Sequence, residues 1–244
     1  MKQPFKYTFA DGQTADVIEV EQWNHLHQAL KQLGFHEFHP TLVLVGGASK
    51  ISPTDMTRLE QIFVEILAPL AESLGVIVVD GGTDAGIMKL IGQARDKIKG
   101  TFPLIGVAAL GTVQLPHASP YLVDAAFLAP HHTHFVLVPG TQWGDESPWL
   151  AHLPSLLSNG LPSVTLVVNG GEITWRDVAY SVKEGRPTFV LGGSGRTADQ
   201  LASAMRGDMA DERATPLIDS GLLHIIKLNQ NLDLIAQELQ RKLS

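Results

Sequence analysis

Short, continuous runs of valine, isoleucine and leucine alternate along this chain with segments of helical periodicity, and this alternation is the strongest constraint on the fold. Continuous apolar runs are typical of strands that helices cover on both faces. The seven runs that we take as strands are residues 41–45, 76–79, 104–108, 134–138, 164–168, 188–191 and 223–228. The pattern predicts an α/β protein with a Rossmann-like, doubly wound, mostly parallel sheet of about seven strands.

Helical segments are expected between most of these strands. The first one begins with Ser52 as its N-cap and Pro53 in its first turn, and Gly75 ends it. The other predicted helices are residues 84–99, 145–158, 175–184, 196–206 and 232–243. Residues 208–216 are polar, and we expect a mobile loop there.

The first forty residues follow a different pattern. Residues 5–9 and 15–20 are expected to form a hairpin around Asp11 and Gly12, followed by a short helix near residues 21–33. We therefore take residues 1–40 as a small N-terminal addition, either at an edge of the sheet or in an oligomer contact. Residues 41–244 form the main domain.

Composition narrows the classes of function. The chain of 244 residues has a formal charge of −7, which argues against a dedicated nucleic-acid binder. It contains no cysteine, so disulfides and thiolate metal sites are excluded. No apolar run approaches the roughly 20 residues of a membrane span, and the first residues lack the apolar core of a signal peptide. We expect a soluble, cytoplasmic protein without a membrane partner.

Glycine-rich turns follow several of the predicted strands. Glycine lets backbone N–H groups approach a ligand, and the N-terminus of the next helix favours an anion. The residues that we predict to bind a ligand in these turns are Gly46, Gly47, Ala48, Ser49 and Lys50, then Gly81, Gly82, Thr83 and Gly86, then Gly193, Ser194, Gly195 and Arg196. The carboxyl ends of parallel strands share one edge, so the turns can converge on a phosphate-bearing ligand of nucleotide size. The alternative is that the glycines only permit tight turns.

The turn at residues 193–198 also fits the pattern G-x-G-x-x-A of dinucleotide-binding proteins. A Rossmann dehydrogenase places this motif early, and an acidic residue ends the following strand to hold the ribose. Here the motif comes late, and the next strand ends in Lys227, Leu228 and Asn229. These differences argue against an NAD dehydrogenase, and no cofactor is required by the pattern.

The loop after the strand at 134–138 is the best candidate for chemistry. It contains Gly140, Thr141, Trp143, Asp145 and Glu146. The two carboxylates either cap the next helix or hold a ribose, where Glu146 would stabilise an oxocarbenium ion with Asp145 in support. Trp143 either stacks on a base or belongs to the core or a lid.

Two further features complete the sequence-based site. Gly111 and Thr112, after the strand at 104–108, and Gly140 and Thr141, in the loop after the strand at 134–138, also belong to the predicted ligand-binding set. His131, His132 and His134 enter a strand, where His132 and His134 would share one face. This spacing matches no strong zinc motif, so we predict no metal site and expect these histidines to bond backbone or a phosphate.

Five of these segments, at residues 44–50, 78–88, 105–108, 131–138 and 193–196, resemble in their order the SLOG superfamily, and within it the LSDAT branch. That branch includes the N-terminal cytosolic region of melastatin-type TRP channels and stand-alone prokaryotic proteins. The resemblance implies a Rossmann-like domain that binds nucleotides or nucleotide-derived signals such as ADP-ribose. It also implies a homo-oligomer, because SLOG proteins commonly self-associate. Without a membrane span, the chain resembles the stand-alone type.

A second SLOG branch, the LOG phosphoribohydrolases, bears on enzyme activity. Its glycine-rich helix entry is similar to residues 81–88, and its P-G-G-x-G-T-x-x-E loop is similar in place to residues 139–146, with Thr141 in place of a glycine. The family's arginine-bearing helix before that loop is replaced by residues 129–132. The resemblance implies Glu146 as a catalytic carboxylate. A ligand-binding sensor is therefore the first expectation, an N-glycosidic nucleotide hydrolase the alternative, and an interaction module with a vestigial pocket the third.

Overall fold

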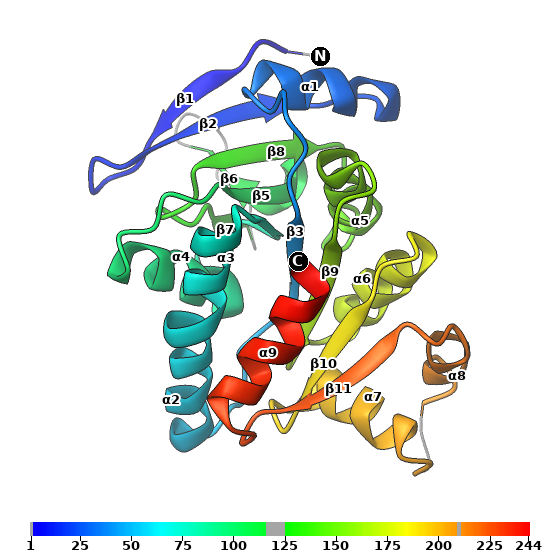
Figure 1. Ribbon diagram of the computed structural model, residues 1–244. Coiled ribbons are helices and arrows are strands. Elements are labelled where there is room, and N and C mark those ends of the chain that lie inside the picture. The colour runs from blue at the N-terminus through cyan, green and yellow to red at the C-terminus, as the bar shows by residue number, and fades with distance from the viewer. Residues whose placement is uncertain (1, 116–124, 209–210) are drawn as a thin grey trace.

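A computed structural model describes residues 2–115, 125–208 and 211–244 of the chain. In these residues nine strands form a single sheet in the order β1-β2-β8-β5-β4-β3-β9-β10-β11 (Figure 1). The strands are β1 (Phe5–Thr8), β2 (Thr14–Glu19), β3 (Thr41–Gly46), β4 (Ile77–Asp80), β5 (Leu104–Ala109), β8 (His134–Val138), β9 (Ser163–Val168), β10 (Thr188–Gly192) and β11 (Leu223–Lys227). Every pair except β1–β2 is parallel. The predicted doubly wound α/β fold is confirmed.

The strands form where they were expected because both of their faces are buried. In β3, Val43 and Val45 belong to the apolar core on one face of the sheet, and Leu42 and Leu44 belong to the core on the other. A strand with this burial has no polar face, which explains the continuous apolar runs. Each of the seven predicted strands lies within one residue of its observed bounds at either end.

The first core is covered by helices α1 (Leu26–Gln32), α5 (Ser147–Ser158), α6 (Glu172–Lys183), α7 (Arg196–Met205) and α8 (Ala214–Asp219). The second core is covered by α2 (Pro53–Ile62), the π-helical segment η2 (Phe63–Leu67), α3 (Ala68–Leu74), α4 (Gly86–Lys97) and α9 (Leu232–Leu243). Figure 1 shows α9 in front of the sheet and α5 and α6 on the other side of it. Helix α8 lies partly inside the segment expected to be a loop; residues 209–210 of that segment lie outside the described part of the chain.

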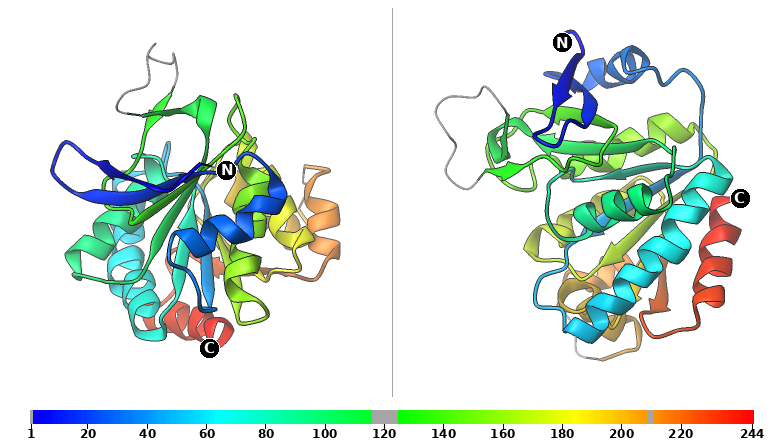
Figure 2. Two further views of the ribbon diagram at one scale, coloured as in Figure 1. Left: turned by 90° about the horizontal axis from the view of Figure 1, so that it is seen from above. Right: turned by 90° about the vertical axis from the view of Figure 1, so that its left-hand side faces the viewer.

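The N-terminal segment extends the sheet at one edge (Figure 2). Strands β1 and β2 form the expected antiparallel hairpin, and β2 pairs in parallel with β8, with Asp16 opposite His134. A short 3₁₀ helix, η1 (Trp23–His25), leads into α1. Ile18, Val20 and Leu26 are buried in the same core as the central strands. This segment is therefore continuous with the main sheet.

Two short strands, and a short helix before the first of them, were not expected from the sequence. The 3₁₀ helix η3 (Leu110–Thr112) leads into β6 (Val113–Gln114), which pairs in parallel with β7 (Ala126–Phe127). They form a separate two-stranded sheet. Strands of two residues are too short to produce a periodic signal in the sequence.

The strand order reverses between β3 and β9. From β3 the chain proceeds outward through β4, β5 and β8, and then returns to place β9 on the other side of β3. In open parallel sheets the loops on either side of such a reversal separate, and the crevice at the carboxyl ends of the two strands is the usual ligand site. A ligand site is therefore expected at the loops after β3 and β9.

Candidate functional site

Gly46 and Val168 bring the ends of β3 and β9 into very close contact. Gly46 has φ of +125°, and a Cβ atom on it would lie 1.9 Å from the carbonyl oxygen of Val168. The amide of Gly47 donates to that same oxygen at 3.0 Å. Only glycine fits at position 46, because any side chain would collide with the neighbouring backbone.

Asn169 connects the loops after three strands. Its side chain is fully buried, and its amide nitrogen donates to the carbonyl oxygens of Ser49 at 3.1 Å and Ser194 at 2.7 Å. Its backbone amide donates to the Ser194 hydroxyl at 2.8 Å. One asparagine therefore fixes the loops after β3, β9 and β10 relative to one another.

This turn was not predicted from the sequence, although the chain carries a signal for it. Residues 164–171 read as an apolar run followed by Asn169, Gly170 and Gly171, and a helix begins at Glu172. This is the same strand-glycine-helix pattern that pointed to the other loops. Asn169 has φ of +53° and Gly170 φ of +92°, so both adopt the left-handed conformation that asparagine and glycine tolerate best.

A cavity of about 250 Å³ lies beside these strand ends. It is lined by Leu44, Val45, Gly46, Gly81, Thr83, Met88, Ala108, Thr112, Trp143, Glu146, Leu150, Gly171, Glu172, Ile173 and Asp177. Five members of the predicted site are in this set, namely Gly46, Gly81, Thr83, Thr112 and Glu146. The structure thus brings together residues from the loops after β3, β4, β5, β8 and β9.

Glu146 lies at the cavity wall just before α5. Its side chain is almost fully buried, and both carboxylate oxygens accept from the amide of Gly144, at 3.1 and 3.0 Å. Burial raises the pKa of Glu146, and the amide hydrogen bonds offset part of that rise. A carboxylate in such a position is suited to accept a proton or a hydrogen bond from a ligand.

Asp177 is the second buried carboxylate of the cavity. The pKa of Asp177 is raised to about 7, mainly by burial and also by the charge of Glu146, while a hydrogen bond from the Ser147 hydroxyl at 2.6 Å opposes the rise. The sequence analysis missed this residue. Its signal was a polar residue on the buried stripe of a helix, where Thr174, Asp177, Val178 and Ser181 recur at three and four residues.

Asp145, the predicted partner of Glu146, takes another position. Its carboxylate accepts from the amides of Thr141 at 3.0 Å and Gln142 at 3.1 Å, and these bonds lower its pKa. It does not belong to the residues that line the cavity. Asp145 stabilises its own loop through these hydrogen bonds, and Asp177 is the second buried carboxylate that lines the cavity with Glu146.

Four more predicted residues line a second hollow of about 580 Å³ next to the cavity. They are Gly47, Ala48, Ser49 and Gly86. Met88 lines both spaces, which therefore flank the turn at Gly46 and Gly47. A ligand longer than the cavity can extend across this turn.

Arg196 does not line the cavity, but it lies beside the lining residue Gly171, at what we call the mouth of the cavity. Its Nη1 donates to the Ser49 hydroxyl at 2.7 Å, and a Cβ atom on the lining residue Gly171 would lie 3.1 Å from its Nη2. The residue itself has φ of +50°, a conformation that is rare for an arginine. Within the described part of the chain, no carboxylate forms an ion pair with Arg196.

The preceding residues of this turn are engaged by the protein itself. The amide of Gly193 donates to the Asp199 carboxylate at 2.5 Å, and Gly193 lines a different hollow. The Ser194 hydroxyl donates to the carbonyl oxygen of Leu191 at 2.6 Å. Gly195 directly precedes Arg196 and has φ of +98°. Gly193 and Ser194 are therefore less available to a phosphate than Arg196 is. Phosphate binding by Arg196 stays a prediction.

The remaining predicted residues serve close packing or lie on the surface. A Cβ on Gly82 would lie 2.8 Å from the Cα of Gly106, where the ends of β4 and β5 meet. Gly111 donates to the carbonyl oxygen of Gly140 at 2.9 Å, which joins the loops after β5 and β8. Thr141 and Lys50 are exposed and line neither space.

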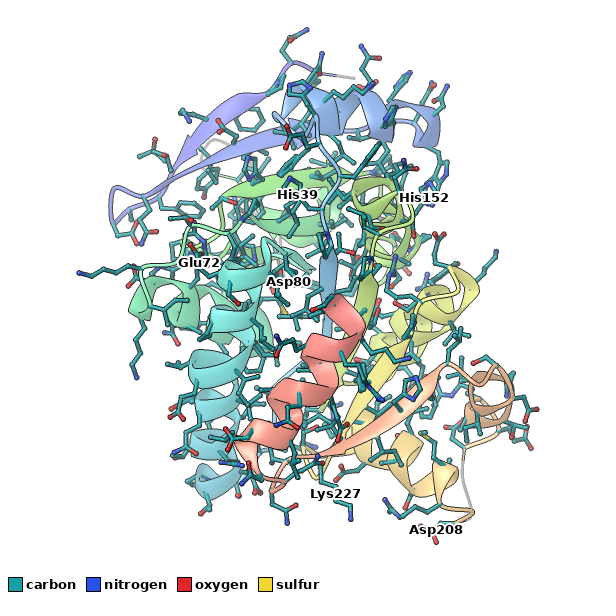
Figure 3. The ribbon with its side chains drawn as sticks, viewed as in Figure 1. His39, Glu72, Asp80, His152, Asp208 and Lys227 are labelled. Atoms are coloured by element: carbon teal, nitrogen blue, oxygen red, sulfur yellow. The ribbon has the colours of Figure 1, made fainter. Side chains whose placement is uncertain are left out.

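The side chains of His131, His132 and His134 contact different parts of the protein. His132 Nε2 lies 2.8 Å from the Asp80 carboxylate, and both side chains are fully buried; Figure 3 labels Asp80 in the interior. His132 stacks on Phe135, but His134 contacts Phe35, so the expectation that they share a face is wrong. His132 precedes β8, where strand alternation does not yet apply. The residues that the structure describes contain no metal-binding group of three His, Cys, Asp or Glu side chains.

These features define a class of protein, namely a Rossmann-like α/β protein in which loops after five strands line one cavity at the reversal of the sheet. Comparison with known families identifies the family of this chain. The family model described as "SLOG in TRPM, prokaryote" matches residues 39–236, and the chain belongs to that family.

Its relatives include cation channels. Transient receptor potential cation channel subfamily M member 2 of Rattus norvegicus is 30% identical over 200 residues, covering 67% of this chain and 13% of the channel. The subfamily M member-like 2 channel of Nematostella vectensis is 28% identical over 206 residues, covering 68% and 13%. The chain therefore spans about an eighth of the length of these relatives. No helix in residues 2–115, 125–208 and 211–244 has the length and apolar character needed to cross a membrane.

Proposed function

We propose that this protein binds a nucleotide or a nucleotide-derived signal, such as ADP-ribose, in the crevice between β3 and β9. The observation that carries the proposal is the convergence of loops from five strands on one cavity, beside which lies Arg196, an arginine without an ion pair among the described residues. Membership of the SLOG family supports a role as a sensor related to nucleotides. The relatives are named as cation channels, and a sensing domain within such a protein would share this fold.

The phosphate would lie at the mouth, between Arg196 and the N-terminus of α6. The twelve residues of α6 begin beside Gly171, which lines the cavity, and the positive end of the helix dipole favours an anion there. The Arg196 guanidinium supplies charge-assisted hydrogen bonds and is already oriented by Ser49. These two features are independent, and both favour the same kind of group.

Isothermal titration calorimetry with ADP-ribose, NAD, AMP and a cyclic nucleotide tests the proposal. At least one of them should bind, and Arg196→Ala should weaken that binding by about tenfold or more, the value of a charge-assisted hydrogen bond. Arg206→Ala is the matched control, because Arg206 follows the same helix and lines a different hollow. No binding by any member of the panel at millimolar concentration would contradict the proposal.

A second candidate is an N-glycosidic nucleotide hydrolase. The specific observation in its favour is that two buried carboxylates, Glu146 and Asp177, line the same cavity. Paired carboxylates of unequal pKa carry out glycoside hydrolysis, one holding a proton and the other stabilising positive charge on the sugar. Chromatography after incubation with nucleotides should then show free base, and Glu146→Gln should abolish it. Activity that survives this substitution would remove Glu146 from the mechanism.

Self-association and a cytoplasmic location stay predictions from the family resemblance and the composition. Size-exclusion chromatography with light scattering tests the first. A mass of one chain at micromolar concentration would contradict it.

A further inference from the structure

The carboxylates of the crevice belong to its lining, and the neighbouring arginines lie outside that lining, where Arg213 forms an ion pair with Glu172. Three carboxylates, of Glu146, Glu172 and Asp177, belong to the lining of the cavity, and the described residues of that lining include no lysine, arginine or histidine. The unpaired Arg196 stands outside, at the mouth. Two of these carboxylates are buried, so a phosphate placed among them would meet like charge in a poorly solvated space.

One carboxylate oxygen of Asp177 accepts no hydrogen bond from the described residues. Its Oδ1 accepts from the Ser147 hydroxyl, and within the described residues its Oδ2 has no hydrogen-bond partner. Nevertheless the residue is more than nine-tenths buried and lines the cavity. The fully buried side-chain atoms without a partner in the described residues are His25 Nδ1, Asp80 Oδ2 and His132 Nδ1, so Asp177 Oδ2 keeps some access to solvent. A ligand that donates hydrogen bonds can therefore reach this oxygen.

The cavity is also small. Its volume of about 250 Å³ lies below the roughly 300–1,000 Å³ of sites that enclose a whole drug-sized ligand. It is therefore too small to enclose a whole nucleotide.

We propose that this cavity is a sugar subsite, in which Asp177 Oδ2 and the Glu146 carboxylate accept hydrogen bonds from the hydroxyls of a ribose while the phosphates stay outside at Arg196. The inference rests on the proposed function, because it takes the nucleotide-derived ligand as given and assigns its ribose to the cavity and its phosphates to Arg196. Carboxylates are the groups that proteins commonly use to hold ribose hydroxyls. Asp177 is then a specificity-determining residue that selects ligands with an intact diol.

Binding through this subsite depends on pH. The charged groups that face Asp177 are Glu146, from the loop before α5, and Arg176 on α6 itself, and Glu172 lines the same cavity. Deprotonation gives Asp177 two accepting oxygens, so the affinity for a diol rises as the pH increases through about 7, where the pKa of Asp177 lies.

The experiment is calorimetry with adenosine and 2′,3′-dideoxyadenosine as probes, compared in the wild-type protein and in Asp177→Asn. The wild type should prefer adenosine by about tenfold or more at pH 8, and the preference should fall to about threefold or less in Asp177→Asn. Asp96→Asn is the matched control, since Asp96 is an exposed residue of α4 that lines neither space. Inorganic pyrophosphate should bind Asp177→Asn as it binds the wild type, and should lose affinity for Arg196→Ala.

Two results would overturn the subsite. One is equal affinity of the wild type for the two nucleosides; the other is a preference that survives in Asp177→Asn. If ADP-ribose nevertheless binds and Arg196→Ala weakens it, the subsite fails and the proposed function stands. If adenosine binds through Asp177 and no phosphate-bearing ligand binds, the subsite stands as a nucleoside site and the proposed function fails.

Discussion

Replacing Asp177 with asparagine should stabilise the protein, and the gain should grow with pH. In the unfolded chain an aspartate releases its proton near pH 3.9. Burial in the cavity raises the pKa of Asp177 from 3.8 to about 7 in the folded protein. Between these values the folded state holds one proton more than the unfolded state. The free energy of unfolding therefore falls by about 1.4 kcal/mol for each pH unit, and the fall amounts to roughly 4 kcal/mol in total.

Above pH 7 both states are ionised and the loss is complete; below pH 4 both are protonated and the loss is absent. Asparagine has nearly the same shape, carries no charge, and its amide oxygen still accepts from the Ser147 hydroxyl. At pH 8 we expect Asp177→Asn to be more stable than the wild type by up to roughly 4 kcal/mol, and at pH 4 by close to zero. Such a loss of stability is typical of residues at functional sites.

Urea denaturation followed by tryptophan fluorescence, at steps between pH 4 and pH 8, measures the difference directly. Comparing the two proteins cancels the titration of all other groups that do not contact Asp177. Asp96→Asn should show no such trend, because Asp96 is exposed. A difference that does not change with pH, or an Asp177→Asn protein that is less stable at pH 8, would refute the reasoning and show that Asp177 is held in its charged form.

Three further predictions follow from the geometry of the site. Gly46→Ala should lower the free energy of unfolding by more than about 3 kcal/mol in chemical denaturation, because its Cβ would meet a carbonyl oxygen at 1.9 Å; Gly12→Ala, at an open turn, should cost only about 1 kcal/mol. Asn169→Ala should cost roughly 2–4 kcal/mol and weaken ADP-ribose binding, and unchanged values in both would mean that the three loops hold their positions without it. Ser147→Ala removes a hydrogen bond that lowers the pKa of Asp177, so the midpoint of the pH dependence of adenosine binding should move upward; a midpoint that stays or falls would contradict this role.

The sequence predicted the sheet well because its strands are buried on both faces. In β3, Leu42 and Leu44 are buried on one face of the sheet, and Val43 and Val45 are buried on the other. The resulting continuous apolar run is typical of a strand covered on both faces. The hairpin at the N-terminus was equally visible, through its two alternating strands around Gly12. The elements that escaped prediction were β6, β7 and α8, which are too short for periodicity to register.

The site was predicted only in part, for two physical reasons. A motif shows which residues follow a strand but not which way they face, so Gly193 and Ser194 were grouped with Arg196 although the protein's own groups satisfy them. Adjacency in sequence also suggested Asp145 as the partner of Glu146. The actual neighbour in the cavity is Asp177, which α6 brings from thirty-one residues further along the chain. Such a pairing depends on how helices pack on the sheet, which a local pattern cannot contain.

The central claim is that a nucleotide-derived ligand lies in the crevice between β3 and β9. A crystal structure of the protein with ADP-ribose is the most direct test of it. We expect the phosphates beside Arg196 and a ribose ring in the cavity against Asp177. A ligand bound in another hollow, or in this crevice with its phosphates among Glu146 and Asp177, would contradict the account.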